Sequence, residues 1–261
     1  MIKFIAFYKD VNESKSKKLQ RRQNLEVFSY RKCLSYLKET FYKFNPKHKF
    51  LIATDQHTEL PDLGVDVIRD DLSQLLIMEA ITRSNTNYVT QNTGKIVLAG
   101  ADHLICGPIE NFFEEDFDLG FWIFPDYDPS HRISVSMTIV LINKNENNEK
   151  KINDFFIERE KICLSLEKKE RQWFADQKSL SMLLDQEDVI KQYHNNKEQT
   201  IFDFRGLKIK FFPYYGKQFL TDVADNGKVE ILDNSVLVDF PGHKSKEYLD
   251  EVYNIVNKGD T

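Results

Sequence analysis

Asp102 stands at a position where a carboxylate can do chemistry. The apolar segment 95–105 (KIVLAGADHLI) predicts a buried strand, and Asp102 lies near its end. A carboxylate there is costly unless it is solvated, paired or bound to a metal. Mg²⁺ and Mn²⁺ prefer oxygen ligands, so one or two such carboxylates can anchor a metal diphosphate. A helix cap or turn is the alternative role for Asp102.

A second pair of candidate side chains opens a predicted helix. Asp176 and Gln177 lie in the first turn of the segment 175–185 (ADQKSLSMLLD). The helix macrodipole favours a carboxylate at that end, so a structural role is the alternative to a chemical one.

These side chains need a scaffold, and the chain predicts strands and helices in alternation. Strands are predicted at 2–8, 49–55, 65–68, 95–105, 118–124, 134–144, 207–213 and 234–240. Helices are predicted at 25–44, 72–84, 152–167, 175–185 and 245–258. Because the strands are mostly continuous apolar runs, we expect an α/β domain with a mostly parallel sheet covered by helices on both faces. Ligands bind such sheets where the strands end.

The composition limits the partners. Its 261 residues carry 36 basic and 41 acidic side chains, a net charge of −5, so no positive field for nucleic acid is expected. The N-terminal apolar run is too short for a signal peptide or a transmembrane segment. Three widely spaced cysteines are typical of buried, reduced thiols in the cytoplasm. The lysine-rich segment 15–22 suits a solvated loop or, alternatively, contact with phosphates or with lipid headgroups at a membrane surface.

The segment 94–122 (GKIVLAGADHLICGPIENFFEEDFDLGFW) resembles a known family. It is similar to the part of nucleotide-diphospho-sugar transferases of the GT-A type in which a strand ends in Asp-x-Asp, before an acidic turn and another strand. Gly100, Ala101 and Asp102 stand at the Asp-x-Asp positions. The resemblance implies a Rossmann-like GT-A domain over 1–261.

Three further segments resemble the family in the same order. The segment 134–145 is similar to the strand that carries Asn-x-Gly in the family, but Ser136, Met137 and Thr138 stand at those positions. The segment 171–186 is similar to the family's Asp-Gln helix start, which faces the donor sugar; Asp176 and Gln177 match it.

The last of these segments, 236–250, resembles the His-x-x-Gly-x-x-Lys element of glycogenin-like transferases. Asp239 stands at the histidine position and Gly242 at the glycine position, while Lys244 and Lys246 flank the lysine position. In the family this element completes the metal shell and approaches the diphosphate.

The resemblance implies a division of the chain and a set of binding residues. The nucleotide-binding half is about 1–106, the acceptor and catalytic half about 107–246, and the C-terminal helix 245–258. A Mn²⁺ or Mg²⁺ ion would be held by Asp102 and Asp239, while a lone histidine such as His103 or His243 is the weaker candidate because it is typical of a protein surface.

The nucleotide contacts follow from the same resemblance. It places Thr54 and Asp55, at the end of the second strand, against the base, and Arg83 against a phosphate. Solvent-facing roles are the alternative for all of them.

The implied activity is transfer of a sugar from a nucleoside diphosphate sugar, with UDP favoured, to a carbohydrate or other acceptor. The Asp-Gln element points to retention of anomeric configuration. A catalytically silent domain of the same fold that binds a nucleotide, glycan or protein is the main alternative, because Gly100 and Asp239 depart from the family motif. A nucleotidyltransferase is disfavoured because no glycine-rich phosphate loop follows the first strand.

Overall fold

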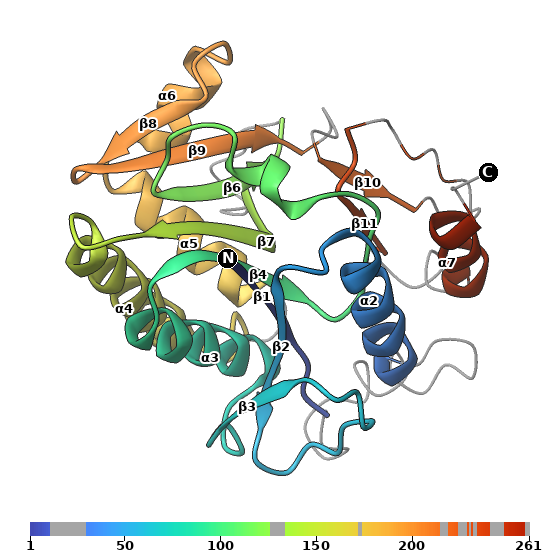
Figure 1. Cartoon of the computed structure of the whole chain (residues 1–261). Coiled ribbons are helices and arrows are strands. Elements are labelled where there is room, and N and C mark those ends of the chain that lie inside the picture. Colours follow the sequence, from blue (N-terminus) through green and yellow to red (C-terminus); the bar gives the residue numbers. More distant parts are fainter. Residues whose placement is uncertain are drawn as a thin grey trace.

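A computed structural model describes residues 1–10, 30–125, 134–171, 174–214, 219–223, 229, 231, 234–240 and 248–258. Figure 1 shows a large twisted sheet with helices packed on both of its faces. In spatial order, the strands of this sheet are β3 (Asp66–Asp70), β2 (Lys49–Asp55), β1 (Ile2–Phe7), β4 (Gly94–Gly100), β7 (Val135–Lys144), β6 (Leu119–Ile123), β9 (Leu207–Pro213) and β8 (Ile201–Phe204). The expected α/β architecture is confirmed. The lysine-rich segment 15–22 lies outside the described residues.

Six strands of the large sheet run in one direction, and β7 and β8 run in the other. Strands β3, β2, β1 and β4 are parallel to one another, and β6 is parallel to β9. Strand β7 lies antiparallel between β4 and β6, and β8 is antiparallel to β9. Because β1 and β4 run in the same direction, Phe7 and Gly100 are paired at a common edge. A ligand site is expected at that edge.

Helices cover the two faces of the sheet and form separate cores. On one face α2 (Tyr30–Phe44) packs Leu34, Leu37 and Phe41 against β1 and β2. On the other face lie α3 (Ile77–Gln91), α4 (Glu149–Ser165), α5 (Ala175–Asp185) and α6 (Val189–Asn195). Apolar strands buried on both faces explain why the sequence showed continuous apolar runs.

A second, small sheet lies beside the first. Its strands are β10 (Leu220–Asp222), β11 (Leu237–Asp239) and β5 (His103–Ile105), with β11 antiparallel to β5. The C-terminal helix α7 (Leu249–Lys258) packs on this sheet, close to α2 (Figure 1). The predicted start of this helix, 245–247, lies outside the described residues.

The predicted strand 95–105 is two strands in the structure. Strand β4 ends at Gly100, and β5 begins at His103 in the other sheet. The short 3-10 helix Ile109–Phe113 follows. Apolar periodicity could not show this break, because the apolar residues of both strands are buried.

The predicted helix 72–84 is displaced in the structure, where α3 runs from Ile77 to Gln91. Glu79 Oε2 accepts a hydrogen bond from Leu76 N and so marks the start. The helix continues through a polar segment because Tyr88 and Val89 near its end are buried in the core. Within it, Thr82, Thr86 and Thr90 donate their hydroxyls to the carbonyl groups four residues earlier. Within the described residues, no helix is both long and apolar enough to cross a bilayer.

Candidate active-site cleft

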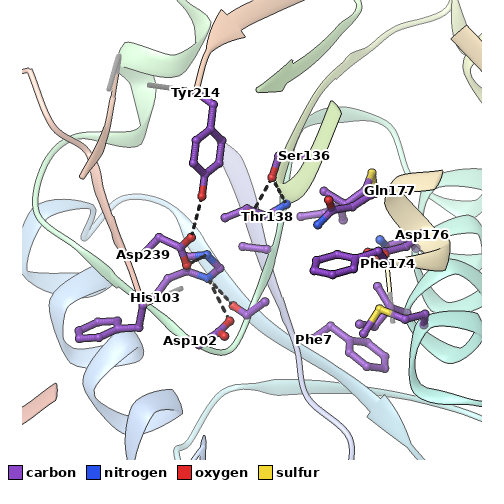
Figure 2. Close-up of a pocket in the computed structure, with 18 of the residues that line it drawn as sticks. Phe7, Asp102, His103, Ser136, Thr138, Phe174, Asp176, Gln177, Tyr214 and Asp239 are labelled. Atoms are coloured by element: carbon purple, nitrogen blue, oxygen red, sulfur yellow. Dashed lines mark hydrogen bonds and ion pairs between the residues drawn. The ribbon is translucent and has the colours of Figure 1, made fainter. Parts of the chain in front are cut away.

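A cleft of about 390 Å³ opens at the carboxyl ends of β1 and β4. Phe7 and Gly100 line it from these strands, and residues at the start of β7 and α5 complete it. Figure 2 shows Asp102, His103 and Asp239 on one side and Asp176 and Gln177 on the other. We call the first group the histidine wall and the second the helix wall.

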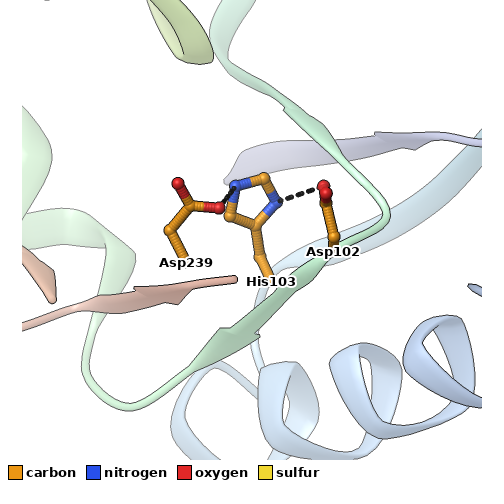
Figure 3. A group of neighbouring side chains, drawn as sticks. All are labelled: Asp102, His103 and Asp239. Carbon is orange, nitrogen blue, oxygen red and sulfur yellow. Dashed lines mark ion pairs between the residues drawn. The ribbon is translucent and has the colours of Figure 1, made fainter. Parts of the chain in front are cut away.

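The histidine wall is assembled from two distant parts of the chain. Antiparallel pairing of β5 with β11 places His103 opposite Asp239. His103 Nε2 lies 3.1 Å from Asp239 Oδ1, and His103 Nδ1 lies 3.9 Å from Asp102 Oδ1 (Figure 3). One ligand-type atom of each residue lies within 4.8 Å of the others. His103 is only 1% exposed, so the surface position expected for such a histidine is wrong.

Both ring nitrogens of His103 face oxygen atoms. Nδ1 lies 3.0 Å from the carbonyl oxygen of Gly100, which can only accept, so Nδ1 carries the proton. Burial alone would lower the pKa of His103, but the carboxylates of Asp239 and Asp102 together with the Gly100 carbonyl raise it by more, and the net shift is upward. The imidazole is therefore held as a proton-bearing bridge between two acids.

Gly100 leaves room for the Asp102 carboxylate. A Cβ atom added at Gly100 would lie 2.7 Å from Asp102 Oδ1, which is closer than real Cβ atoms come to an oxygen. The residue that departs from the Asp-x-Asp pattern is thus the one that lets Asp102 take its present orientation.

The helix wall is fixed to the central sheet through the second half of α5. Ser181 Oγ accepts hydrogen bonds from the backbone nitrogens of Ser134 and Val135 at the beginning of β7. Asp176 and Gln177 lie in the first turn of the helix, as predicted. Among the described residues, no donor lies within hydrogen-bonding distance of Asp176 Oδ1 or Gln177 Oε1. Both acceptors belong to residues that line the cleft.

Asp176 is buried, with 6% of its surface exposed. Burial raises the pKa of its carboxyl group, while the nearby guanidinium of Arg159 and backbone hydrogen bonds lower it by less. A buried carboxylate with an unpartnered oxygen is costly in a protein interior, and such groups are expected at sites that bind a ligand.

Several cleft residues were not predicted from the sequence as contacts. Ser136 Oγ donates to Thr138 Oγ1 at 2.8 Å and accepts from Thr138 N at 3.1 Å, so both hydroxyls are ordered beside the cleft. Tyr214 donates to Asp239 Oδ2 at 3.4 Å. Phe174 is 42% exposed and has a left-handed backbone, with φ of 66°, immediately before α5. No sequence signal marked Phe174, because its position depends on the packing of α5.

Asp55 and Thr54 do not line this cleft. Asp55 Oδ1 accepts from the backbone nitrogens of His57 and Thr58, at 3.2 and 2.6 Å, and Oδ2 lies 3.1 Å from Lys9 Nζ. Burial raises the pKa of the Asp55 carboxyl, but its bonds to Thr58 and Lys9 lower it by more, and the net shift is downward. Asp55 therefore closes a turn and neutralises a buried lysine.

Arg83 also lies outside the cleft lining. On α3 it forms an ion pair with Glu160 of α4, so its charge joins two helices. Gly242, Lys244 and Lys246, together with His243, lie outside the described residues. Of the predicted site residues, the structure brings Asp102, Asp239, Asp176 and Gln177 together.

No family model and no curated protein matches the sequence. Solved structures do match. A glycosyltransferase involved in glycosylation of the major capsid of PBCV-1 shares 8% identity at a TM-score of 0.46, over 97% of this chain and 98% of that one. The inositol-1-phosphate CTP transferase from T. maritima shares 14% identity at 0.46, over 98% and 95% of the two chains.

The glycosyltransferase GlyE of Streptococcus pneumoniae is similar over 98% of this chain, with 14% identity and a TM-score of 0.50. The chain has the GT-A type of fold. It covers 63% of GlyE. A likeness at this identity establishes the architecture, and the chemistry has to be argued from the cleft. The resemblance to glycogenin-like transferases stays a prediction.

Proposed function

We propose that the cleft binds a nucleoside diphosphate sugar, with UDP favoured, and transfers the sugar to a carbohydrate acceptor. The observation that carries the proposal is the pairing of two unlike walls across one cleft. One wall presents two carboxylates and an imidazole, and the other presents two acceptor oxygens that have no donor among the described residues.

The helix wall suits a ligand rich in hydroxyl groups. In its ionised form Asp176, like Gln177 Oε1, offers only acceptor oxygens to the cleft, so the missing partners must be donors. Sugar hydroxyls are donors of the required kind, and each bond to the ionised Asp176 would be charge-assisted. An aliphatic ligand would leave both oxygens buried and unpaired, which costs about 1–3 kcal/mol for each group.

The charge of the cleft requires a cation for a diphosphate. Its described lining includes the carboxylates of Asp102, Asp176 and Asp239 but no lysine or arginine. Like unit charges about 4 Å apart repel by roughly 4 kcal/mol near a protein surface. Two carboxylate ligands with an imidazole suit Mn²⁺ and also accept Mg²⁺. We assign the ion to Asp102 and Asp239, with His103 as a further ligand once Nε2 loses its proton.

The residues of the two walls and of the segment after β11 would then have separate roles. A metal ion bound at the histidine wall would neutralise charge on the departing diphosphate. Lys244 and Lys246, with Gly242 between them and the strand, are proposed to approach that diphosphate from the segment after β11. Asp176 and Gln177 hold the sugar from the other wall, with Asp176 close to the anomeric carbon, and this placement favours retention. The proposed contacts of Thr54 and Asp55 with the base, and of Arg83 with a phosphate, are the least supported by the geometry.

The proposal is tested by calorimetric titration with UDP, GDP and CDP, each with and without Mn²⁺. We expect UDP to bind only with the metal, and ligand at 100 times its Kd to stabilise the fold by roughly 2.7 kcal/mol. Asp102→Asn and Asp239→Asn should each weaken binding by about tenfold while the fold persists. Asp154→Asn, an exposed carboxylate on α4, is the matched control.

The transfer step is measured separately as metal-dependent hydrolysis of a UDP-sugar. Binding without hydrolysis or transfer would favour a catalytically silent domain. The proposal fails if none of these nucleotides binds in the presence of millimolar Mn²⁺ or Mg²⁺. Cytoplasmic location, suggested by the three widely spaced cysteines, stays a prediction.

A further inference from the structure

Arg159 is a full positive charge in the interior of the protein. It lies on α4 and is 0% exposed. Among the described residues, no acceptor lies within hydrogen-bonding distance of its Nε or Nη2 atoms. An unpaired guanidinium is rarely tolerated in a protein interior, so a compensating negative charge is required.

The immediate contacts of Arg159 do not supply that charge. Its Nη1 atom donates to the thioether sulfur of Met137 at 3.4 Å, and the guanidinium lies 5.2 Å from the centre of the Phe156 ring. A thioether is a weak acceptor, and a cation–π contact offsets only part of the desolvation. Met137 also lines the cleft, and we call the surface that it forms the cleft floor. The guanidinium lies directly behind this floor.

Asp176 is the complementary feature on the neighbouring helix. Helices α4 and α5 pack together, and Asp176 is buried on the side of α5 that borders the cleft. Among the described residues, its Oδ1 atom lacks a donor, just as two nitrogens of Arg159 lack an acceptor. The two buried charges lie near enough to act electrostatically on one another, and the described residues satisfy each of them incompletely.

We propose that Arg159 is a positioning residue that holds Asp176 ionised and directed at the cleft from beneath its floor. Arg159 does not touch the ligand. Its charge compensates the buried carboxylate, and its contact with Met137 keeps the guanidinium between α4, β7 and α5. The kinetic consequence rests on the proposed function, whereas the electrostatic pairing does not.

The other ionisable groups around Arg159 are less suited to this role. Glu160 is engaged by Arg83, and Glu79 on α3 is engaged by Arg171. Burial raises the pKa of the Cys163 thiol, which therefore stays neutral. Within the described part of the chain, Asp176 has the largest effect among the charges that act on Arg159, and Arg159 is the charged side chain that lowers the pKa of Asp176.

The pairing is tested by a double-mutant cycle of Arg159→Met and Asp176→Asn, followed by urea unfolding. We expect the two substitutions to be coupled by at least about tenfold in the unfolding equilibrium constant, as for buried partners. The matched control is Lys150→Met with Asp154→Asn, an exposed pair on the same helix, where about twofold or less is expected. Arg159→Gln, which also removes the charge but keeps a polar head group, takes its place in the cycle if Arg159→Met does not fold.

The kinetic arm follows UDP-sugar turnover against pH. Loss of the Arg159 charge should raise the pKa of Asp176 further, so the acidic limb of kcat/KM moves to higher pH in Arg159→Met, and Arg159→Lys restores it. Coupling no larger than in the control cycle overturns the inference even if the enzyme is active. Strong coupling without any turnover supports the pairing and counts against the proposed function alone.

Discussion

Asp55 and Asp176 are two aspartates with almost equal exposure, 5% and 6%, and opposite environments. Asp55 has two backbone donors and a lysine, and its pKa is lowered. Asp176 has an oxygen without a donor among the described residues, and its pKa is raised. The first residue is satisfied by the protein itself. The second leaves an acceptor for a ligand, with the charge of Arg159 nearby, so the hydrogen bonds separate a structural carboxylate from a candidate functional one.

The largest effect is expected for the stability of Asp55→Asn. Removing the negative charge leaves Lys9 buried beside a neutral amide, and breaking such a pair costs about 3 kcal/mol. Urea unfolding measures this loss, with Asp154→Asn as control. If Asp55→Asn is as stable as the wild type, or if it loses UDP affinity and not stability, the prediction that Asp55 contacts the nucleotide would be favoured again.

Asp176→Asn should show the opposite profile. We expect turnover per folded molecule to fall at least about tenfold, or roughly 1.4 kcal/mol of barrier, because the charge near the reacting sugar is lost. Turnover is measured well below the melting temperature and normalised to the folded fraction. Asp188→Asn, an exposed aspartate before α6, is the control. Full turnover in Asp176→Asn would make the helix wall structural.

A smaller effect is expected in how the free energy of unfolding decreases at acidic pH. The folded-state pKa of Asp55 lies below the unfolded value of about 3.9, so its contribution is complete above that pH and is lost as the pH falls through the lowered pKa. Unfolding free energy measured from about pH 6 downward should therefore fall less steeply in Asp55→Asn than in the wild type. Equal slopes would mean that the ionisation of Asp55 does not stabilise the fold.

The smallest effect is expected for Gly100→Ala. The added methyl group displaces the Asp102 carboxylate, which is the end of a flexible side chain, so the fold should persist. Metal-dependent UDP affinity should fall by a few-fold, less than in Asp102→Asn. Calorimetry distinguishes the two variants. Unchanged affinity in Gly100→Ala would show that the present orientation of Asp102 is not the one used for binding.

The sequence predicted more of the scaffold than of the cleft. Strands β1, β2 and β7 and the start of α5 lie where apolar runs and helical spacing placed them. The exceptions are local. Strand β8 and helix α6 were missed because the segment 189–204 mixes short apolar runs with polar residues. The threonine-rich end of α3 was missed because packing of Tyr88 and Val89 in the core sustains it.

The sequence by itself determined the class of fold. It also placed Asp102 near the end of a strand and Asp176 at the start of a helix, because strand periodicity and helix starts are local properties. Asp239 was placed through a resemblance alone. Only the tertiary structure brought His103 between Asp102 and Asp239, since that contact depends on β5 leaving the main sheet to pair with β11. Only the tertiary structure buried Arg159 beside Asp176 as well. Burial and distant pairing arise from packing between elements, which no local pattern encodes.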